Sequence, residues 1–236
     1  MVLVDGVFII ELFLLNRFPK RRAENDIIFD KQKQWMLTDL RREPERIFDS
    51  NVKHLLDALR SSYLPTTRKA LHDGRKKIEA IPRASLLQAA GVKFRMSKSH
   101  CLFDIKFSKG VLEIPCFKLF PWTESFLRNI MAFEQSYYRD DSYFIDYIAF
   151  LGNLINTRAD AKLLIQKGII NIENWLGNDE TLANLFNSFG KESGVWKRNI
   201  GFCSVRQDLK AYCRTPWHKW KVSMKRDSMS KKKLQV

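Results

Sequence analysis

The sequence predicts an α+β fold that is mainly helical, with a small antiparallel β-hairpin at about residues 102–115. Three observations support this fold class. Apolar residues recur at helical spacing through most of the chain, strict two-residue alternation is confined to one short region, and 45% of the 236 residues are apolar. This length and apolar content suffice for one globular domain with its own core, whereas two full domains would be cramped.

The N-terminal part of the chain is predicted to be helical. Residues 1–18 are apolar almost all round, which is typical of a helix covered on every side. The apolar stretch of roughly 14 residues is shorter than the about 20 that a membrane span needs, and no basic leader marks a signal peptide. A second helical pattern runs from Ile47 to Leu64 and ends at Pro65. Residues 66–80 are polar, basic and interrupted by Gly74, so they are the best candidate for a linker.

The hairpin is the clearest local prediction. Apolar and polar residues alternate on both sides of Lys109-Gly110, and the glycine supplies the positive φ that a tight turn requires. A turn there gives three cross-strand pairs: Phe107 with Leu112, Lys106 with Glu113, and Ile105 with Ile114.

Helical spacing returns after the hairpin, and several helix starts carry capping residues. Thr123 is placed to cap one helix, and Thr157 with Asp160 forms a capping-box-like start for another, which Gly168 ends. A further helix follows Asn178. The other helical patterns run from Tyr143 to Ile155 and from Val205 to Met224, the last interrupted by Pro216.

The net charge of +15 is unevenly distributed. Residues 68–109 carry +8 and residues 191–236 carry +10, whereas residues 110–190 carry −4. Such clusters indicate an anionic partner, whether phospholipid headgroups, nucleic acid or an acidic protein. Solvated lysines that keep the protein in solution are the alternative explanation.

The sequence predicts neither a metal site nor a cofactor. Four cysteines with no CxxC pair are not a disulfide scaffold in a chain of this length, and a reducing compartment is the better expectation. Cys203, Cys213 and His218 lie close in the sequence, but their spacing fits no zinc motif. No nucleotide-binding or nucleophile motif is present.

Two groups of acidic residues are candidates for acid–base chemistry. Asp5 and Glu11 lie in the apolar N-terminal stretch, where burial would raise their pKa, but they are expected on different faces of a helix. Structural hydrogen bonds or a tertiary ion pair are therefore the expected explanation of these two acids. Glu124 and Glu134 flank Arg128, and the i,i+4 spacing of Glu124 and Arg128 favours an ion pair on the helix surface.

The C-terminal segment combines tryptophan with basic residues. Tryptophan prefers the headgroup level of a bilayer, and basic clusters are attracted to anionic lipid. The residues predicted to contact a membrane surface are Trp217, Trp220, Lys219, Lys221, Lys225 and Arg226. Packing of both indole rings in the core is the alternative.

Longer motifs follow one another between residues 81 and 180. They are Ile81-Pro82, AAGVKF from Ala89, LFDIKFSKGVLEIP from Leu102, TESFLRNIMAFEQ from Thr123, LINT from Leu154 and NWLGNDE from Asn174. In this order and spacing they resemble the plant family called domain of unknown function 247. The resemblance covers most of residues 1–30 and 81–227.

The resemblance implies one domain over residues 1–227, incomplete at its N-terminus and interrupted near residues 41–80. Residues 228–236 are expected to form a disordered basic tail. Residues 211–227 resemble the segment that precedes a hydrophobic membrane anchor in the family, and Ser228 to Lys233 stand where that anchor begins. The resemblance therefore implies plasma-membrane association for the family, and a cytoplasmic location for a copy that lacks the transmembrane helix.

These observations favour a non-enzymatic interaction or signalling component. Its partners would be a protein that the sequence does not identify and an anionic membrane surface; the sequence makes no prediction about the oligomeric state. One alternative is an enzyme that uses the buried acids. The other is a weak nucleic-acid binder, which is less expected because aromatic residues do not alternate with the lysines of residues 68–109 as a stacking platform needs.

Overall fold

The computed structural model describes residues 55–65, 80–121, 123–139, 141–172, 177–193 and 202–214. The chain divides into two units, residues 1–66 and 67–236, and this boundary falls at the start of the segment predicted as a linker. The described part of the first unit is helix α4 (Leu55–Tyr63), which ends just before Pro65 as expected. The single-domain boundaries inferred from the sequence stay a prediction.

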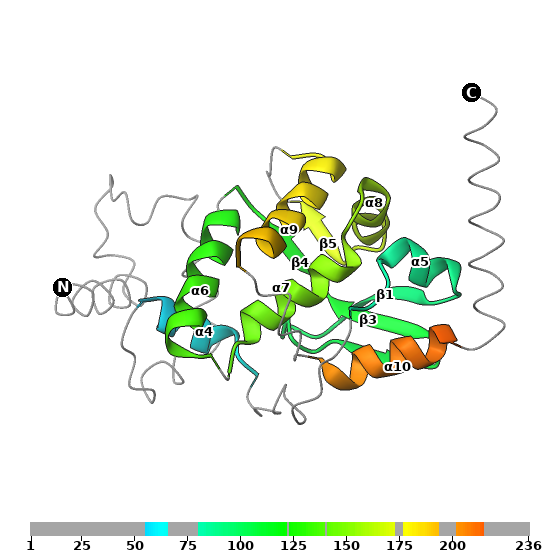
Figure 1. The fold of residues 1–236 in the computed structure, drawn as a ribbon, viewed down its shortest axis with the longest axis horizontal. Helices are drawn as coiled ribbons and strands as arrows, with labels where there is room; N and C mark the ends of the chain where they lie inside the picture. Colours follow the sequence, from blue (N-terminus) through cyan, green and yellow to red (C-terminus); the bar gives the residue numbers. More distant parts are fainter. Residues whose placement is uncertain are drawn as a thin grey trace, which may run out of the picture. The chain divides into compact units, whose positions relative to one another are not determined.

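The second unit contains the described strands and the remaining described helices (Figure 1). In chain order these are α5 (Ala84–Ala89), β1 (Lys93–Ser97), β2 (Lys106–Ser108), β3 (Val111–Pro115), β4 (Phe117–Leu119), α6 (Thr123–Tyr137), α7 (Tyr143–Leu154), α8 (Arg158–Gln166), β5 (Ile170–Ile172), α9 (Asp179–Ser193) and α10 (Cys203–Arg214). The predicted α+β, mainly helical fold class is confirmed.

Strands β2 and β3 form the predicted hairpin. Lys106 pairs with Glu113 and Phe107 with Leu112, as expected. Both turn residues have positive φ, 48° at Lys109 and 76° at Gly110, as a type I′ turn requires. The first strand is shorter than predicted: Ile105 precedes β2, and the residues from 101 to 104 form a turn.

The hairpin is part of a three-stranded sheet, called sheet A below, that the sequence analysis did not predict. Strand β1 runs parallel to β3, with Phe94 opposite Leu112, so the order is β1-β3-β2. Past Cys116 the chain continues as β4, which changes partners and pairs in parallel with β5. The extended run over residues 111–119 therefore belongs to both sheets.

The core of this unit is built around α7. All residues from Tyr143 to Leu151 are buried, and Figure 1 shows α7 passing between α9 and the strands of sheet A. Helix α9 packs on α7 and α8, α6 packs on α7, and α5 packs on α8. Helix α9 has apolar residues at helical spacing that are all buried, namely Leu182, Leu185, Phe186 and Phe189.

The predicted caps of α8 and α9 are present, whereas Thr123 is the first residue of α6 and its Oγ1 accepts the backbone N–H of Phe120 at 2.9 Å, before the helix. Thr157 donates from its amide and hydroxyl to Asp160 Oδ2, at 2.9 and 2.7 Å, at the start of α8. Gly168 ends that helix with φ 68°. Asn178 Oδ1 accepts the backbone N–H groups of Glu180 and Thr181, at 3.0 and 2.9 Å, at the start of α9.

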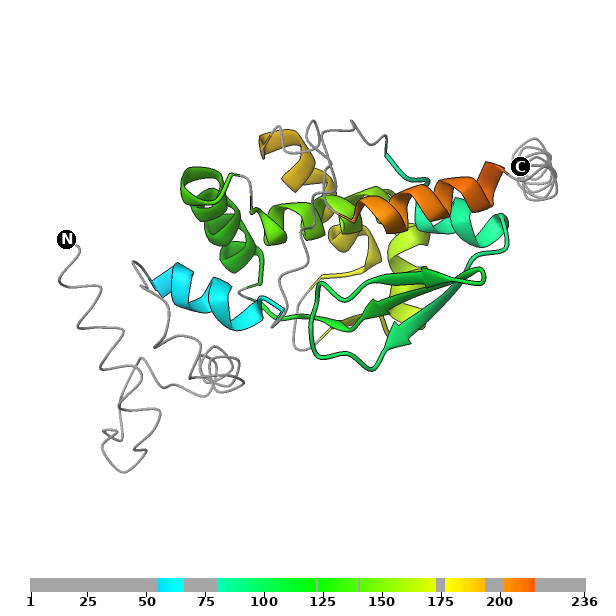
Figure 2. The same ribbon diagram turned by 90° about the horizontal axis from the view of Figure 1, so that it is seen from below.

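Helix α10 packs against the hairpin. Tyr212 makes an edge-to-face contact with Phe107, with ring centroids 5.5 Å apart, and its hydroxyl lies 2.8 Å from where a Cβ on Gly110 would stand. Phe202, just before the helix, packs its ring on Phe150 of α7. Figure 2 shows α10 in orange lying along one side of the strands of sheet A. The end of the described chain at Arg214 therefore lies close to the Lys109-Gly110 turn.

No helix in the described part of the chain has the length and apolar character to cross a membrane. The predicted helix over residues 1–18 and the helical pattern beyond Arg214 lie outside the described residues.

Candidate functional site

The residues predicted to contact a membrane surface lie outside the described part of the chain, and so do Asp5 and Glu11. The membrane-contact residues are Trp217, Trp220, Lys219, Lys221, Lys225 and Arg226. Their proposed roles stay predictions. Among the described residues, no group of three or more His, Cys, Asp or Glu side chains is arranged to hold a metal ion.

The ion pair predicted on α6 is present and also ties two helices together. Arg128 donates to Glu124 Oε1 from Nε at 3.0 Å and from Nη2 at 2.9 Å. The same guanidinium donates to Ser188 Oγ on α9 at 3.1 Å and lies 5.2 Å from the centre of the Phe189 ring. Arg128 therefore positions α6 against α9.

Glu134, the other acid considered on α6, has no exposed surface. Its Oε2 accepts the backbone N–H of Ile145 at 3.0 Å, in the first turn of α7. The first N–H groups of a helix have no partner within the helix, and a carboxylate near them is also favoured by the helix dipole. Glu134 thus caps α7 from a neighbouring helix.

Asp160 caps two helices at once, whereas the sequence indicated only the cap of α8. It is fully buried. Its Oδ2 accepts the two bonds from Thr157, and its Oδ1 accepts the backbone N–H of Ser85 at 2.8 Å, in the first turn of α5. One carboxylate therefore fixes the starts of α5 and α8.

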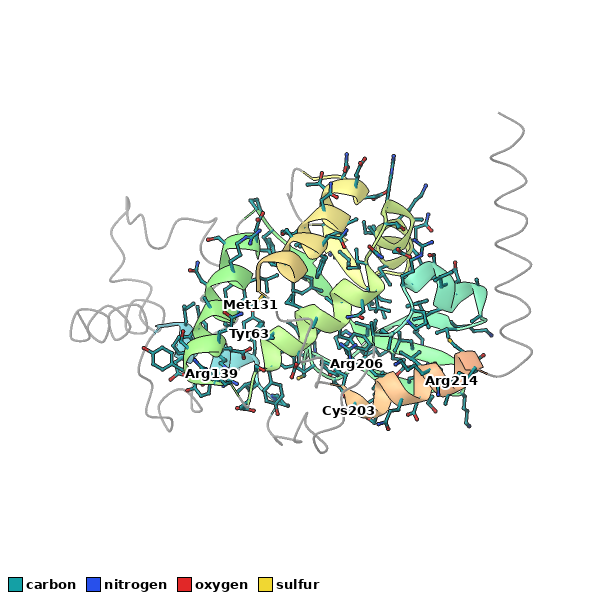
Figure 3. All side chains as sticks on the ribbon, in the orientation of Figure 1. Tyr63, Met131, Arg139, Cys203, Arg206 and Arg214 are labelled. Atoms are coloured by element: carbon teal, nitrogen blue, oxygen red, sulfur yellow. The ribbon has the colours of Figure 1, made fainter. Side chains whose placement is uncertain are left out.

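A buried charge pair connects α7 and α10. Arg206 has no exposed surface and Asp146 is 4% exposed. Burial lowers the pKa of Arg206 to about 10, while the nearby carboxylate of Asp146 opposes that change. The guanidinium also lies 5.2 Å from the centre of the Phe150 ring, and Figure 3 labels Arg206 on α10 between that helix and α7. Arg206 remains charged at neutral pH and holds α10 against the core.

The exposed charges of sheet A are strongly biased in sign. In β1 the buried side chain is Phe94, while Lys93 and Arg95 are exposed; in β2 Lys106 is exposed. The register places Lys106 and Arg95 on either side of Glu113, on the face opposite Phe94 and Leu112. We call the exposed cations on this face and at its strand ends the basic face: Lys93, Arg95, Lys98, Lys106 and Lys109.

Two carboxylates partly offset this charge. Arg95 forms an ion pair with Glu113, and Lys106 Nζ lies 2.8 Å from Asp104 Oδ2. The hydrogen bond to Asp104 raises the pKa of Lys106, so this side chain stays protonated well above neutral pH. Five cations face two carboxylates, and the basic face is therefore positive.

Sequence reasoning found that residues 68–109 are basic, but not that Lys93, Arg95 and Lys106 share one face of a sheet. The alternation of Lys93, Phe94 and Arg95 is a local signal for strand β1. This signal is short, and the partner strand β3 is not adjacent to β1 in the sequence.

Comparisons with known proteins identify a family but find no solved structure that matches this chain. The family model described as "Plant protein of unknown function", domain of unknown function 247, matches residues 42–234. The chain is 30% identical to UPF0481 protein At3g47200 of Arabidopsis thaliana, over 60% of this chain and 34% of that protein. It is 27% identical to UPF0481 protein At3g02645 of the same plant, over 58% of this chain and 26% of that protein. The chain thus spans about a third or less of each relative. No solved structure matches.

Proposed function

Starting from the fact that this chain belongs to the plant family of domain of unknown function 247, we propose that it is a non-enzymatic interaction component that docks on an anionic membrane surface. The observation that supports this function is the basic face of sheet A. Its cations are exposed and lie on one side of a short sheet whose other side is packed against the core. A face of this kind can approach a layer of phosphate headgroups with several cations at once.

The expected strength of membrane binding follows from the charges on the basic face. Each basic residue near an anionic leaflet contributes about 1 kcal/mol, and the attraction decays within a Debye length of roughly 8 Å at physiological salt. With the exposed side of sheet A toward the leaflet, the cations of the basic face would approach the headgroups together. We therefore expect weak, reversible and salt-dependent binding from the face alone.

The C-terminal segment is the second part of the proposed membrane contact. Tyr212 places the end of α10 beside the Lys109-Gly110 turn, at one end of the basic face. The segment with Trp217 and Trp220 follows a few residues later in the chain. Interfacial tryptophans and the lysines beside them would add apolar and electrostatic attraction to that of the sheet.

The arrangement of the described acids favours an interaction role over an enzymatic one. The buried acids Glu134 and Asp160 accept backbone N–H groups at helix starts, and the exposed Glu124 pairs with Arg128. Removing Glu134 or Asp160 would therefore damage the fold before it could reveal a catalytic role.

The side chains of the basic face also favour lipid over nucleic acid. The residues on the exposed side of the strands are Lys93, Arg95, Ser97, Lys106, Ser108, Val111 and Glu113. None of these described residues is aromatic, so this face offers no ring on which a nucleotide base could stack.

Vesicle co-sedimentation of the full chain tests the proposal. We expect the protein to pellet with vesicles that contain phosphatidylserine, to stay in the supernatant with phosphatidylcholine alone, and to dissociate as salt is raised. Equal behaviour with both kinds of vesicle would refute the membrane proposal. Tighter binding to DNA or RNA than to the anionic vesicles would favour the nucleic-acid alternative.

A further inference from the structure

Two cysteines approach one buried tyrosine on the core side of the strands, in an arrangement that is independent of the basic face. Tyr147 on α7 has no exposed surface, and its hydroxyl makes no hydrogen bond within the described structure. Its ring contacts Phe103 at 5.7 Å and Phe117 at 5.9 Å between centroids. Cys101 precedes Phe103 by two positions and Cys116 directly precedes Phe117. Both cysteine-bearing segments therefore meet at Tyr147.

The backbone brings the same two segments together. Strand β1 ends with Ser97 opposite Pro115 of β3, and Cys116 is the next residue. After β1 the chain turns instead of extending, because the Ser99 N–H donates to Ser97 Oγ at 3.1 Å and the Cys101 N–H to Ser99 Oγ at 3.3 Å. Cys101 is thereby kept near the end of β1.

Both cysteines are partly exposed, since Cys101 and Cys116 are half-buried. Burial is the main cause that raises the pKa of Tyr147, and Cys116 and Cys101 both add to it. This hydroxyl therefore stays protonated and carries no charge that would repel a thiolate.

We propose that Cys101 and Cys116 are a dithiol site that exchanges with low-molecular-weight disulfides, such as oxidised glutathione, to form an intramolecular disulfide. The thiolate of one cysteine attacks glutathione disulfide, which breaks its S–S bond and releases one glutathione thiolate. The thiolate of the second cysteine then attacks the protein sulfur of the mixed disulfide and releases the second glutathione. The protein loses two electrons and two protons, and one glutathione disulfide becomes two glutathione thiols.

The product would connect the loop after β1 to the junction of β3 and β4. This junction is where the extended run leaves sheet A and joins β5. The disulfide would therefore tie the loop after β1 to the segment that joins the two sheets.

Peptide mapping of the full chain gives a direct test. Trypsin places the four cysteines in separate peptides, residues 99–106, 110–118, 199–206 and 211–214. After equilibration of the folded protein with oxidised glutathione and alkylation of remaining thiols, we expect the peptides 99–106 and 110–118 to be joined, with a loss of two hydrogens. Joined peptides from any other pairing, or glutathione on Cys101 and Cys116 without a link between them, would overturn the proposal.

A matched pair of variants controls for unspecific oxidation. Cys213→Ser removes a half-buried thiol whose pKa is raised by burial, and it should leave the 99–106 to 110–118 link unchanged. Cys101→Ser should abolish the link and leave Cys116 with glutathione attached. If Cys213→Ser removed the link as Cys101→Ser does, the assignment to Cys101 and Cys116 would be wrong.

Discussion

At the scale of single residues, Asp146 and Arg206 show how the second unit tolerates buried charge. Both side chains are removed from water, and taking a charge out of water costs several kcal/mol unless an opposite charge lies close to it. The pKa of Arg206 falls only to about 10, so burial does not neutralise it at pH 7. The attraction between α7 and α10 therefore depends on both charges being present.

A double-mutant cycle on this pair should show strong coupling. Asp146→Asn leaves a buried guanidinium without its nearby carboxylate, and we expect it to lower the free energy of unfolding by about 3–5 kcal/mol. Arg206→Met keeps an aliphatic stem over Phe150 but leaves Asp146 buried, so its cost should be similar. The double variant should cost clearly less than the sum of the two. Urea unfolding measures all three, and additive losses would contradict the pairing.

At the scale of secondary structure elements, single carboxylates fix the ends of helices that are distant in sequence. Asp160 accepts bonds from Thr157 and from Ser85, so α5 and α8 share one cap. Glu134 does the same for α7 from α6. These caps set the relative position of helices as well as their starting residues.

Removal of the shared cap should therefore cost more than removal of an ordinary one. Asp160→Ala leaves two partly buried backbone N–H groups, of Ser85 and Thr157, without their acceptor, and we expect a loss of about 2–4 kcal/mol in the free energy of unfolding. Asn178→Ala removes an exposed cap of α9 and should cost about 1 kcal/mol. Equal losses in urea unfolding would show that Asp160 does not connect the two helices.

The contact of α10 with the hairpin can be tested with two glycines. Gly110 and Gly168 both have positive φ, 76° and 68°, so alanine at either costs about 1–2 kcal/mol from the backbone alone. At Gly110 the new Cβ would also lie 2.8 Å from the Tyr212 hydroxyl, whereas at Gly168 the nearest atom, Met96 Sδ, is 3.5 Å away. We expect Gly110→Ala to be the more destabilising variant by about 1 kcal/mol or more. It should also speed amide hydrogen exchange in α10, and no difference between the two variants would argue against this packing.

The elements that the sequence predicted correctly are those defined by local signals. The cap of Thr157 with Asp160, the cap of Asn178 and the Lys109-Gly110 turn each lie within a few residues of the structure they determine. Strand β1 has only a short alternation from Lys93 to Arg95 as a local signal, because it pairs in parallel with a strand that is distant in sequence and Met96 is 47% exposed. Strands β4 and β5 pair Phe117 with Ile170 across three helices.

From the sequence, the candidate site could be predicted only as a net charge, because pairing between strands that are distant in sequence decides which cations share a face. The sequence shows that residues 68–109 are basic, but only the parallel pairing of β1 with β3 places Lys93, Arg95 and Lys106 on one side of a sheet. The helix caps made by Glu134 and Asp160 also depend on packing between helices, so their acids resembled catalytic candidates or local caps in the sequence.

At the scale of the whole molecule, we expect the charge on one face of the second unit to determine binding to an anionic membrane surface. Lys93 and Lys98 are exposed on the basic face, and Arg158 and Lys162 are exposed on α8. Exchanging either pair for glutamate changes the net charge by the same amount. The two double variants therefore separate the effect of position from the effect of total charge.

The most direct measurement is the affinity of these two variants for vesicles that contain phosphatidylserine. With about 1 kcal/mol for each cation near the leaflet, Lys93→Glu with Lys98→Glu should bind at least about 30-fold more weakly than the unmodified chain. Arg158→Glu with Lys162→Glu should bind within a few-fold of it. If both double variants lost affinity equally, or neither did, the basic face of sheet A would not be the membrane-binding surface.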